Sequence, residues 1–317
     1  MARIGYFLSC EEITPAELIE QARMAEKAGF AGLAISDHFH PWNEAQGNSP
    51  FVWSVIGALS QVTALPVTTL VTCPTVRLHP VVTAQAAATA AVMTAGRFRL
   101  GVGTGEALNE HVAGAPWPAW DVRADMLAEA VAVMRRLFTG KTVTHRGRHY
   151  TVDNARLYTV PQNDVPIYVS AFGPQSLDLA ARIGDGLVTT QPDPDAVRAF
   201  RDSRGRGPVL GGLKVCWDGN RDRAVETAHR LWAVEHLPGE LGQVLPTPQH
   251  FEQAAELVTP DIVAKAVTCG DDVEEHVAGL RTFVDAGFDE VFVGQIGAHH
   301  GEFFRAYGER VLPALKG

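Results

Sequence analysis

The stretch SDHFHPW, residues 36–42, places one carboxylate, two imidazoles and an indole within seven residues. It follows an apolar run at 31–35 that predicts a buried strand, and a helical pattern begins near residue 50. An imidazole has an ordinary pKa of about 6.5, so His38 is a candidate general base at neutral pH. A metal site is disfavoured, because His38 and His40 form an H-x-H pair without further ligands at a recognisable spacing. We therefore expect no resident metal.

A second candidate lies in GVGTGEALNE, residues 101–110, where Glu106 follows a glycine-rich turn. Its carboxyl group can act as the acid that complements a histidine base. Glycines between a strand and a helix also let backbone N–H groups approach a phosphate. However, the spacing G-x-G-x-G lacks the third glycine of a dinucleotide fingerprint, which disfavours a Rossmann nicotinamide site. From these residues alone, the alternative stays open that His38 caps a helix and Glu106 lies in a solvated loop.

The elements that must position these residues alternate between short apolar strands and helices along almost the whole chain. Eight strand–helix units with nearly continuous apolar strands are typical of an α/β fold, the closed (β/α)8 TIM barrel. A doubly wound open sheet is the alternative, because a local pattern does not show closure. Strands are expected at 3–9, 31–36, 67–72, 98–103, 166–171, 186–190, 208–217 and 290–296, and helices at 14–29, 50–64, 80–95, 121–138, 174–183, 194–203, 221–235 and up to about Leu315.

Two segments interrupt this alternation, and we expect both to be insertions in one domain that spans 1–317. The segment at about 141–160 predicts a β-hairpin, because residues 141–152 alternate around a central Arg-Gly pair. The segment at about 237–269 predicts additional helices.

The composition excludes several classes of function. The net charge of −9 and the pI of about 5.7 argue against general nucleic-acid binding, which requires a basic surface. The most apolar stretch, at about 82–93, is shorter than the roughly 20 residues of a membrane-spanning helix, and the first residues lack the pattern of a signal peptide. The four cysteines lie far apart in sequence, which favours a reduced, cytoplasmic protein. The expected partner is a small-molecule substrate, with no nucleic acid and no membrane.

In a barrel, the loops that follow the strands gather on one face, where active sites are built. That face would bring together residues that are far apart in the chain. They are Glu11 after the first strand, His38 and Trp42 after the second, Cys73 after the third, Glu106 and Asn109 after the fourth, and Phe172 and Gly173 after the fifth.

The order of the motifs SDHFHPW, VTCPTVRLHP, GVGTGEALNE and AFGP resembles the luciferase-like superfamily of hydride-transfer enzymes. More narrowly, the chain is similar to the branch that uses the deazaflavin coenzyme F420, typified by the F420-dependent glucose-6-phosphate dehydrogenases. The resemblance covers nearly the whole chain. It implies a (β/α)8 barrel, coenzyme F420 as cofactor and a homodimer.

The resemblance also implies a role for each site residue. His38 matches the base that takes the hydroxyl proton as hydride leaves the substrate, and Glu106 matches the acid that protonates the reduced deazaflavin. Trp42 matches the indole beside the reacting centre, and Glu11 a further carboxylate of the pocket. The Leu70–Val71 pair matches a cis peptide bond beneath the ring. The implied cofactor-binding residues are Asp37, Leu70, Val71, Cys73, Asn109, Phe172 and Gly173.

Two positions depart from the sugar-phosphate branch. Its members carry a lysine soon after the sixth strand that helps to hold the sugar phosphate, whereas Asp193 lies near that position here. A carboxylate would repel a phosphate. Cys73 also stands where relatives carry threonine. We therefore expect an uncharged alcohol or ketone as substrate and glucose 6-phosphate to be a poor one.

Three other functions stay open at this point, since a fold does not determine a function. The chain could be an F420-dependent sugar-phosphate dehydrogenase or a luciferase-like monooxygenase that uses FMN. It could also be a non-enzymatic protein that binds and stores the coenzyme.

Overall fold

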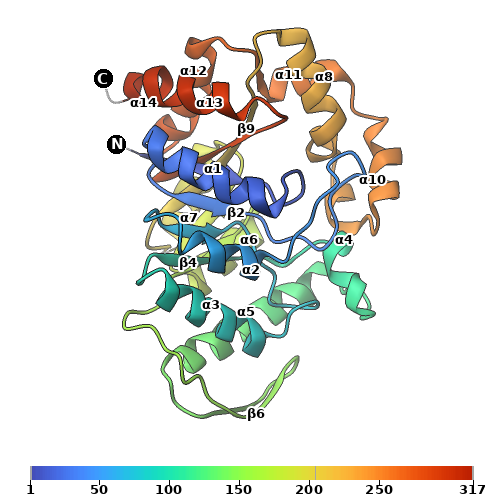
Figure 1. Ribbon diagram of the computed structural model, residues 1–317. Coiled ribbons are helices and arrows are strands. Elements are labelled where there is room, and N and C mark those ends of the chain that lie inside the picture. The colour runs from blue at the N-terminus through green and yellow to red at the C-terminus, as the bar shows by residue number, and fades with distance from the viewer. Residues whose placement is uncertain (1, 204, 316–317) are drawn as a thin grey trace.

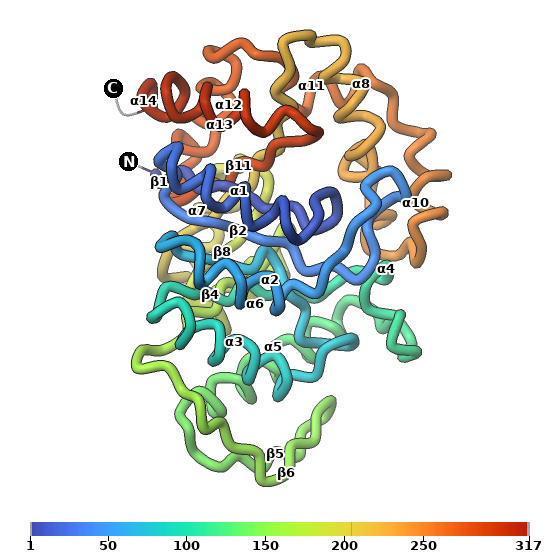
Figure 2. Tube along the Cα trace, viewed as in Figure 1, coloured from blue at the N-terminus to red at the C-terminus, as the bar shows by residue number. Residues whose placement is uncertain are grey.

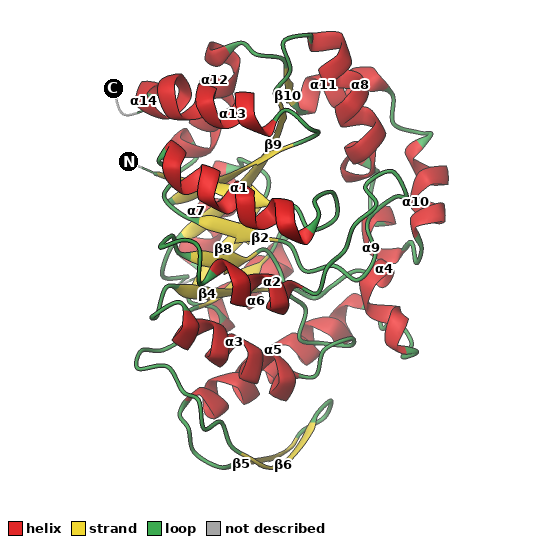
Figure 3. Cartoon of the chain, viewed as in Figure 1, coloured by secondary structure: helices red, strands yellow, loops and turns green. Residues whose placement is uncertain are grey.

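Eight parallel strands close into a barrel surrounded by helices (Figures 1 and 3). The computed structural model describes residues 2–203 and 205–315. The pairing order is β11–β1–β2–β3–β4–β7–β8–β9, and β9 pairs with β11 to complete the ring. The (β/α)8 prediction is therefore confirmed, and the open sheet is wrong. The strands are β1 (Arg3–Leu8), β2 (Leu33–Ile35), β3 (Val67–Thr69), β4 (Phe98–Val102), β7 (Ile167–Ser170), β8 (Gly186–Thr189), β9 (Val209–Cys216) and β11 (Glu290–Gln295).

Helices follow the strands and cover the outside of the barrel, as Figure 3 shows. The first begins at a capping box, in which the side chains of Thr14 and Glu17 each bind the other residue's backbone N–H. The helices are α1 (Pro15–Ala28), α2 (Val52–Leu59), α3 (Pro80–Met93), α4 (Ala107–Glu110), α5 (Trp120–Phe138), α6 (Pro174–Ile183), α7 (Pro194–Asp202), α12 (Val273–Asp285), α13 (His300–Ala306) and α14 (Leu312–Ala314).

Several boundaries differ from the sequence prediction. The strand expected at 67–72 ends at Thr69, and the peptide bond that follows, Leu70–Val71, is cis. The helix expected at 50–64 ends at Leu59. Helix α12 was not predicted at all, although Asp272 caps its start by accepting a hydrogen bond from the backbone N–H of Glu274.

The first insertion is the predicted hairpin, formed by β5 (Val143–Arg146) and β6 (Thr151–Ala155), which hangs below α5 in Figure 2. One carboxylate fastens it to α5. Glu129 accepts hydrogen bonds from His145 Nε2 and from the backbone N–H groups of Arg148, His149 and Tyr150. The hydroxyl of Tyr150 then donates to the carbonyls of Pro74 and Thr75, so the hairpin supports the loop that follows β3.

The second insertion follows β9 and is helical, as predicted. Helix α8 (Arg221–Trp232), the predicted barrel helix after β9, and a short turn at 233–236 precede it. It comprises α9 (Leu241–Val244), α10 (Pro248–Ala255) and α11 (Pro260–Ala266). It ends in a two-residue strand, β10 (Thr268–Cys269), that pairs with β9 and was not predicted. Of the single domain expected over 1–317, residues 1, 204 and 316–317 lie outside the described residues.

The N-terminal ends of the strands enclose a buried ionic group. Glu290 at the start of β11 is completely buried, and its two oxygens accept from Arg99 at 2.6 and 3.1 Å. Arg3 at the start of β1 adds a third contact at 3.1 Å. Paired guanidinium groups satisfy this carboxylate, so the group closes that end of the barrel.

All four cysteines, Cys10, Cys73, Cys216 and Cys269, are buried and unpaired in the described structure. Over residues 2–203 and 205–315, the helices are too short or too polar to cross a membrane.

Candidate active site

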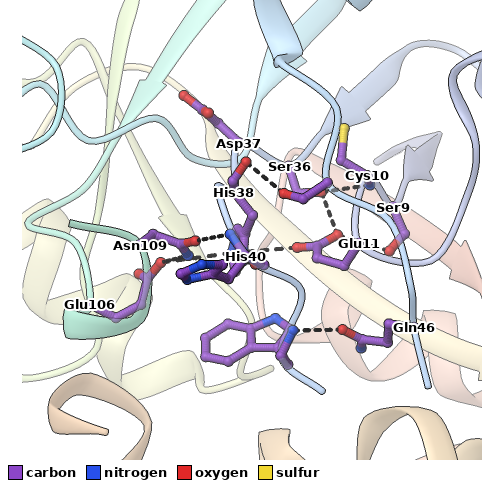
Figure 4. A network of polar contacts seen from close by, with 12 residues as sticks. Ser9, Cys10, Glu11, Ser36, Asp37, His38, His40, Gln46, Glu106 and Asn109 are labelled. Carbon is purple, nitrogen blue, oxygen red and sulfur yellow. Dashed lines mark hydrogen bonds and ion pairs between the residues drawn. The ribbon is translucent and has the colours of Figure 1, made fainter. Parts of the chain in front are cut away.

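The C-terminal ends of the strands hold a cluster of titratable side chains, shown in Figure 4. Glu11 follows β1, His38 follows β2 and Glu106 follows β4. Because β1 and β2 are neighbours and β4 is only two strands further, the barrel brings these three groups together. The prediction that loops after the strands would assemble them is thus confirmed for this trio.

His38 is held in one orientation by its own loop. Its Nδ1 donates to the carbonyl of His40 at 3.2 Å, so Nε2 carries the lone pair of the neutral ring. Nε2 lies 3.4 Å from Glu11 Oε1 and 3.8 Å from Glu106 Oε1. Figure 4 shows the two carboxylates on either side of the imidazole. Nε2 is therefore the nitrogen that can accept a proton, and the carboxylate of Glu11 can stabilise the resulting cation.

Glu11 is oriented by two hydroxyl groups. Ser9 and Ser36 donate to its Oε2 at 2.9 and 2.7 Å. Burial raises the pKa of Glu11, but the charge of His38 and the hydrogen bond from Ser36 outweigh burial, and the pKa is lowered. Glu11 is accordingly an anion at neutral pH.

Asn109 joins the loop after β2 to Glu106. Its Oδ1 accepts from the backbone N–H groups of Phe39 and His40 at 2.8 and 2.9 Å, and its Nδ2 donates to Glu106 Oε1. His40 Nδ1 also donates to the carbonyl of Leu108 at 3.1 Å. Sequence reasoning assigned Asn109 to the cofactor, whereas the structure places most of its hydrogen-bonding groups between two protein loops.

Asp37 belongs to a second ionic group behind the same loop. Its carboxylate accepts from the hydroxyl of Thr72 and from Arg77 Nη2, the latter at 2.9 Å. Glu110 accepts from the backbone N–H of Arg77 at 2.8 Å. Burial raises the pKa of Glu110 to about 7, against the lowering effect of Arg77. Sequence reasoning missed Arg77 and Glu110, although both lie in the quoted motifs.

The remaining predicted cofactor residues line the barrel mouth. Leu70 and Val71 are half-buried and pack on the apolar interior of the barrel. A Cβ on Gly103 would lie 2.8 Å from Val71 Cγ2 and 3.7 Å from Cys73 Sγ, so only glycine permits this approach of the loops. A Cβ on Gly173 would meet open space.

These surroundings fit the flat ring of a cofactor. Aliphatic groups and an exposed Phe172, with 54% of its surface accessible, offer apolar contact. The carboxyl group of Glu106 stays 21% exposed beside them and is within reach of a bound molecule.

Trp42 forms the wall next to His38. The two ring centres are 4.9 Å apart at an angle of 59°. Trp42 also packs on Phe251 from α10, with the ring centres 5.0 Å apart in an edge-to-face arrangement at 78°. Phe251 was not predicted, because nothing in the local pattern of the insertion indicates which residue reaches the barrel.

The cations around the mouth already have partners. Lys214 of β9 pairs with Glu235 and lies 3.9 Å from the ring centre of Trp232. Arg123 stacks on Trp117 at 4.1 Å and donates to Gln243. Asp193, which lies near the position expected for a lysine, is exposed and caps α7. Among the described residues, we find no group of three or more His, Cys, Asp or Glu side chains that could hold a metal ion.

Comparison with known proteins decides the family. A model of the luciferase-like monooxygenases matches residues 2–290. The chain belongs to this luciferase-like family. Two relatives named F420-dependent glucose-6-phosphate dehydrogenase, from Nakamurella multipartita and Microbacterium testaceum, are 37% and 35% identical to it. The alignments cover 99% of the chain and 96% and 97% of these relatives.

Two solved structures share the fold of the chain over nearly its full length. A structure described as an F420-dependent secondary alcohol dehydrogenase with an F420–acetone adduct is 34% identical, covers 100% of both chains and superposes with a TM-score of 0.93. The F420-dependent tetrahydromethanopterin reductase of Methanopyrus kandleri, at 22% identity and a TM-score of 0.79, shares the fold.

Proposed function

We propose that this luciferase-like chain is an F420-dependent dehydrogenase or reductase that moves a hydride between an alcohol or carbonyl carbon and the deazaflavin. The observation that carries the proposal is His38 Nε2, held with its lone pair free between Glu11 and Glu106. Relatives named for coenzyme F420, at 37% and 34% identity over nearly the full length, support the cofactor.

The side chains divide the proton chemistry between two places. His38 Nε2 takes the proton from the substrate hydroxyl, while Glu11 stabilises the imidazolium that forms. Glu106, which is partly exposed, is the proton donor toward the cofactor. Trp42 keeps water from one side of the imidazole.

Coenzyme F420, when bound, supplies a two-electron hydride acceptor. The residues that would hold it are Leu70, Val71, Cys73, Phe172 and Gly173, because they offer apolar contact and open space at the mouth. Asp37 and Asn109 contribute by fixing the loops, through the contacts with Arg77 and Glu106.

An uncharged alcohol or ketone is the favoured substrate. The names of the relatives point to glucose 6-phosphate, but Lys214 and Arg123 are already engaged. Asp193 presents a carboxylate where a phosphate-binding lysine was expected. The wall formed by Trp42 and Phe251 is apolar. A phosphate there would lose hydration without a counter-ion.

A side-by-side titration of the purified protein with oxidised F420 and with FMN tests the cofactor. We expect tight binding of F420 and weak binding of FMN. Oxidation of propan-2-ol and of glucose 6-phosphate in the presence of F420 then tests the substrate, and we expect the alcohol to be preferred. A preference for FMN with oxygen consumption would support the monooxygenase alternative and refute the proposal.

A coenzyme-storage protein is distinguished by substitution of the two proton-transfer groups. In an enzyme, His38→Ala and Glu106→Gln each lower kcat strongly while F420 still binds. A storage protein would lose nothing with either substitution.

We further propose a homodimer in the cytoplasm. A surface groove of about 320 Å³ between α2 and α3 is lined by apolar side chains that include Phe51, Val82 and Met93, and such a patch is typical of an interface. The four unpaired cysteines fit a reducing compartment. Light scattering should show a dimer for the wild type and a monomer for Val82→Asp.

A further inference from the structure

The wall beside His38 is positioned by a helix that lies outside the barrel. Trp42 packs on Phe251, which is completely buried in α10. Phe251 forms one apolar cluster with Leu108 and Val234, and Trp42, Leu237, Leu245 and Ala255 pack against it. Side chains of the second insertion thus pack against the indole of Trp42.

Hydrogen bonds fix the same segment to α8 and to the second insertion. The backbone N–H of Glu44 donates to Glu252 Oε1 of α10 at 3.0 Å. Asn43 and Gln46 both donate to the carbonyl of Leu231 at the end of α8, each at 2.9 Å. Gln46 also accepts from the backbone N–H of Trp42 at 2.8 Å. The loop that carries Trp42 therefore follows any movement of α8 and α10.

We propose that Phe251 is a specificity-determining residue that limits the size of the alcohol or ketone by holding Trp42 toward His38. Its ring approaches Trp42 edge-on, an arrangement that fixes the indole plane. A smaller residue at 251 leaves space into which Trp42 can retreat, and the distance available to a substrate beside His38 grows. Phe251 touches Trp42 and acts through it. The inference rests on the proposed function.

The test compares Phe251→Ala and Phe251→Leu with Gln253→Ala, a control at an exposed position of the same helix. We measure kcat/KM with F420 for propan-2-ol and for the bulkier cyclohexanol. The ratio of cyclohexanol to propan-2-ol should rise at least about tenfold in Phe251→Ala, less in Phe251→Leu, and stay unchanged in Gln253→Ala. An unchanged ratio in the folded Phe251 variants refutes the inference. If Phe251→Ala does not fold, Phe251→Leu decides.

A second measurement needs no substrate and no cofactor. The unfolding free energies of Trp42→Phe, Phe251→Leu and the double variant form a cycle in the apo-protein. Non-additive changes show that the two rings are coupled, and additive changes refute the inference. Failure of the wild type to oxidise any secondary alcohol would instead refute the proposed function, and the cycle would still test the coupling of Trp42 and Phe251.

Discussion

The two ends of the barrel both hold buried ionic groups, and the groups differ in how closely their charged atoms are paired. At the N-terminal end, Glu290 receives three guanidinium contacts between 2.6 and 3.1 Å. At the C-terminal end, His38 Nε2 faces Glu11 and Glu106 across 3.4 and 3.8 Å. The closely paired carboxylate of Glu290 stabilises the fold. The imidazole of His38, which makes only long contacts with its two neighbours, can still bind a substrate.

Removal of the imidazole of His38, at the C-terminal end of the barrel, should have the largest effect, and that effect should be on catalysis. His38→Ala should lower kcat by about 10²–10⁴-fold, the usual contribution of a general base. Its unfolding free energy should fall less than that of Arg99→Met, because the buried Glu11 keeps the hydrogen bonds from Ser9 and Ser36 when the imidazole is lost. Steady-state kinetics and urea unfolding check both parts. Full activity in His38→Ala would remove the proposed base.

At the N-terminal end of the barrel, a substitution should lower the stability of the protein and leave catalysis unchanged. Arg99→Met leaves Glu290 buried with only Arg3, and should destabilise the protein by about 3–5 kcal/mol while kcat per folded molecule is kept. Arg3→Met is the control, since the Arg3 side chain is 56% exposed and its loss should cost at most about 1 kcal/mol. Equal costs for both variants would contradict the role of burial.

Glu110 is a buried carboxyl group at the C-terminal end of the barrel, and it should make the stability of the protein depend on pH. Its pKa is raised from 4.5 to about 7, so the folded protein holds this proton longer than the unfolded chain does. As pH rises through this window, the unfolded state loses its proton first, and the unfolding free energy falls by roughly 3 kcal/mol. Glu110→Gln should lack this fall. Urea unfolding of both proteins between pH 4 and 8, in about one-unit steps, measures it; parallel curves would exclude the shift.

Asn109 should have the smallest effect, since it only joins two loops. Asn109→Ala should lower kcat by about tenfold through displacement of Glu106 and the His38 loop, with F420 still bound. Asn109→Asp keeps the acceptor for the Phe39 and His40 amides but places a second carboxylate beside Glu106. Its pH–rate profile should therefore move to higher pH, and an unmoved profile would contradict a contact with Glu106.

The barrel could be predicted from the sequence because its strands are apolar runs that repeat with helices. All eight predicted strands overlap observed ones. Helix α12 and strand β10 were missed, since a two-residue strand has no period and the helix lies beyond a long insertion. The ends of strands were also placed too far along, as at Leu70.

The candidate site was predicted in part. His38, Glu11 and Glu106 come together as expected, because adjacent strand ends must meet. The pairing of Arg77 with Asp37 and the contact of Phe251 with Trp42 could not be predicted. Such contacts join residues far apart in sequence, and their side-chain directions follow from packing alone.

The attachment of the hairpin to Glu129 links the backbone amides of residues 148–150 to the loop after β3 at the mouth of the barrel. Three consecutive amides, those of Arg148, His149 and Tyr150, donate to the single carboxylate of Glu129. They can exchange hydrogen with solvent only when that attachment opens. The same opening withdraws the Tyr150 hydroxyl from the loop next to Cys73. The exchange rate of these amides therefore measures how often the loop after β3 loses its support.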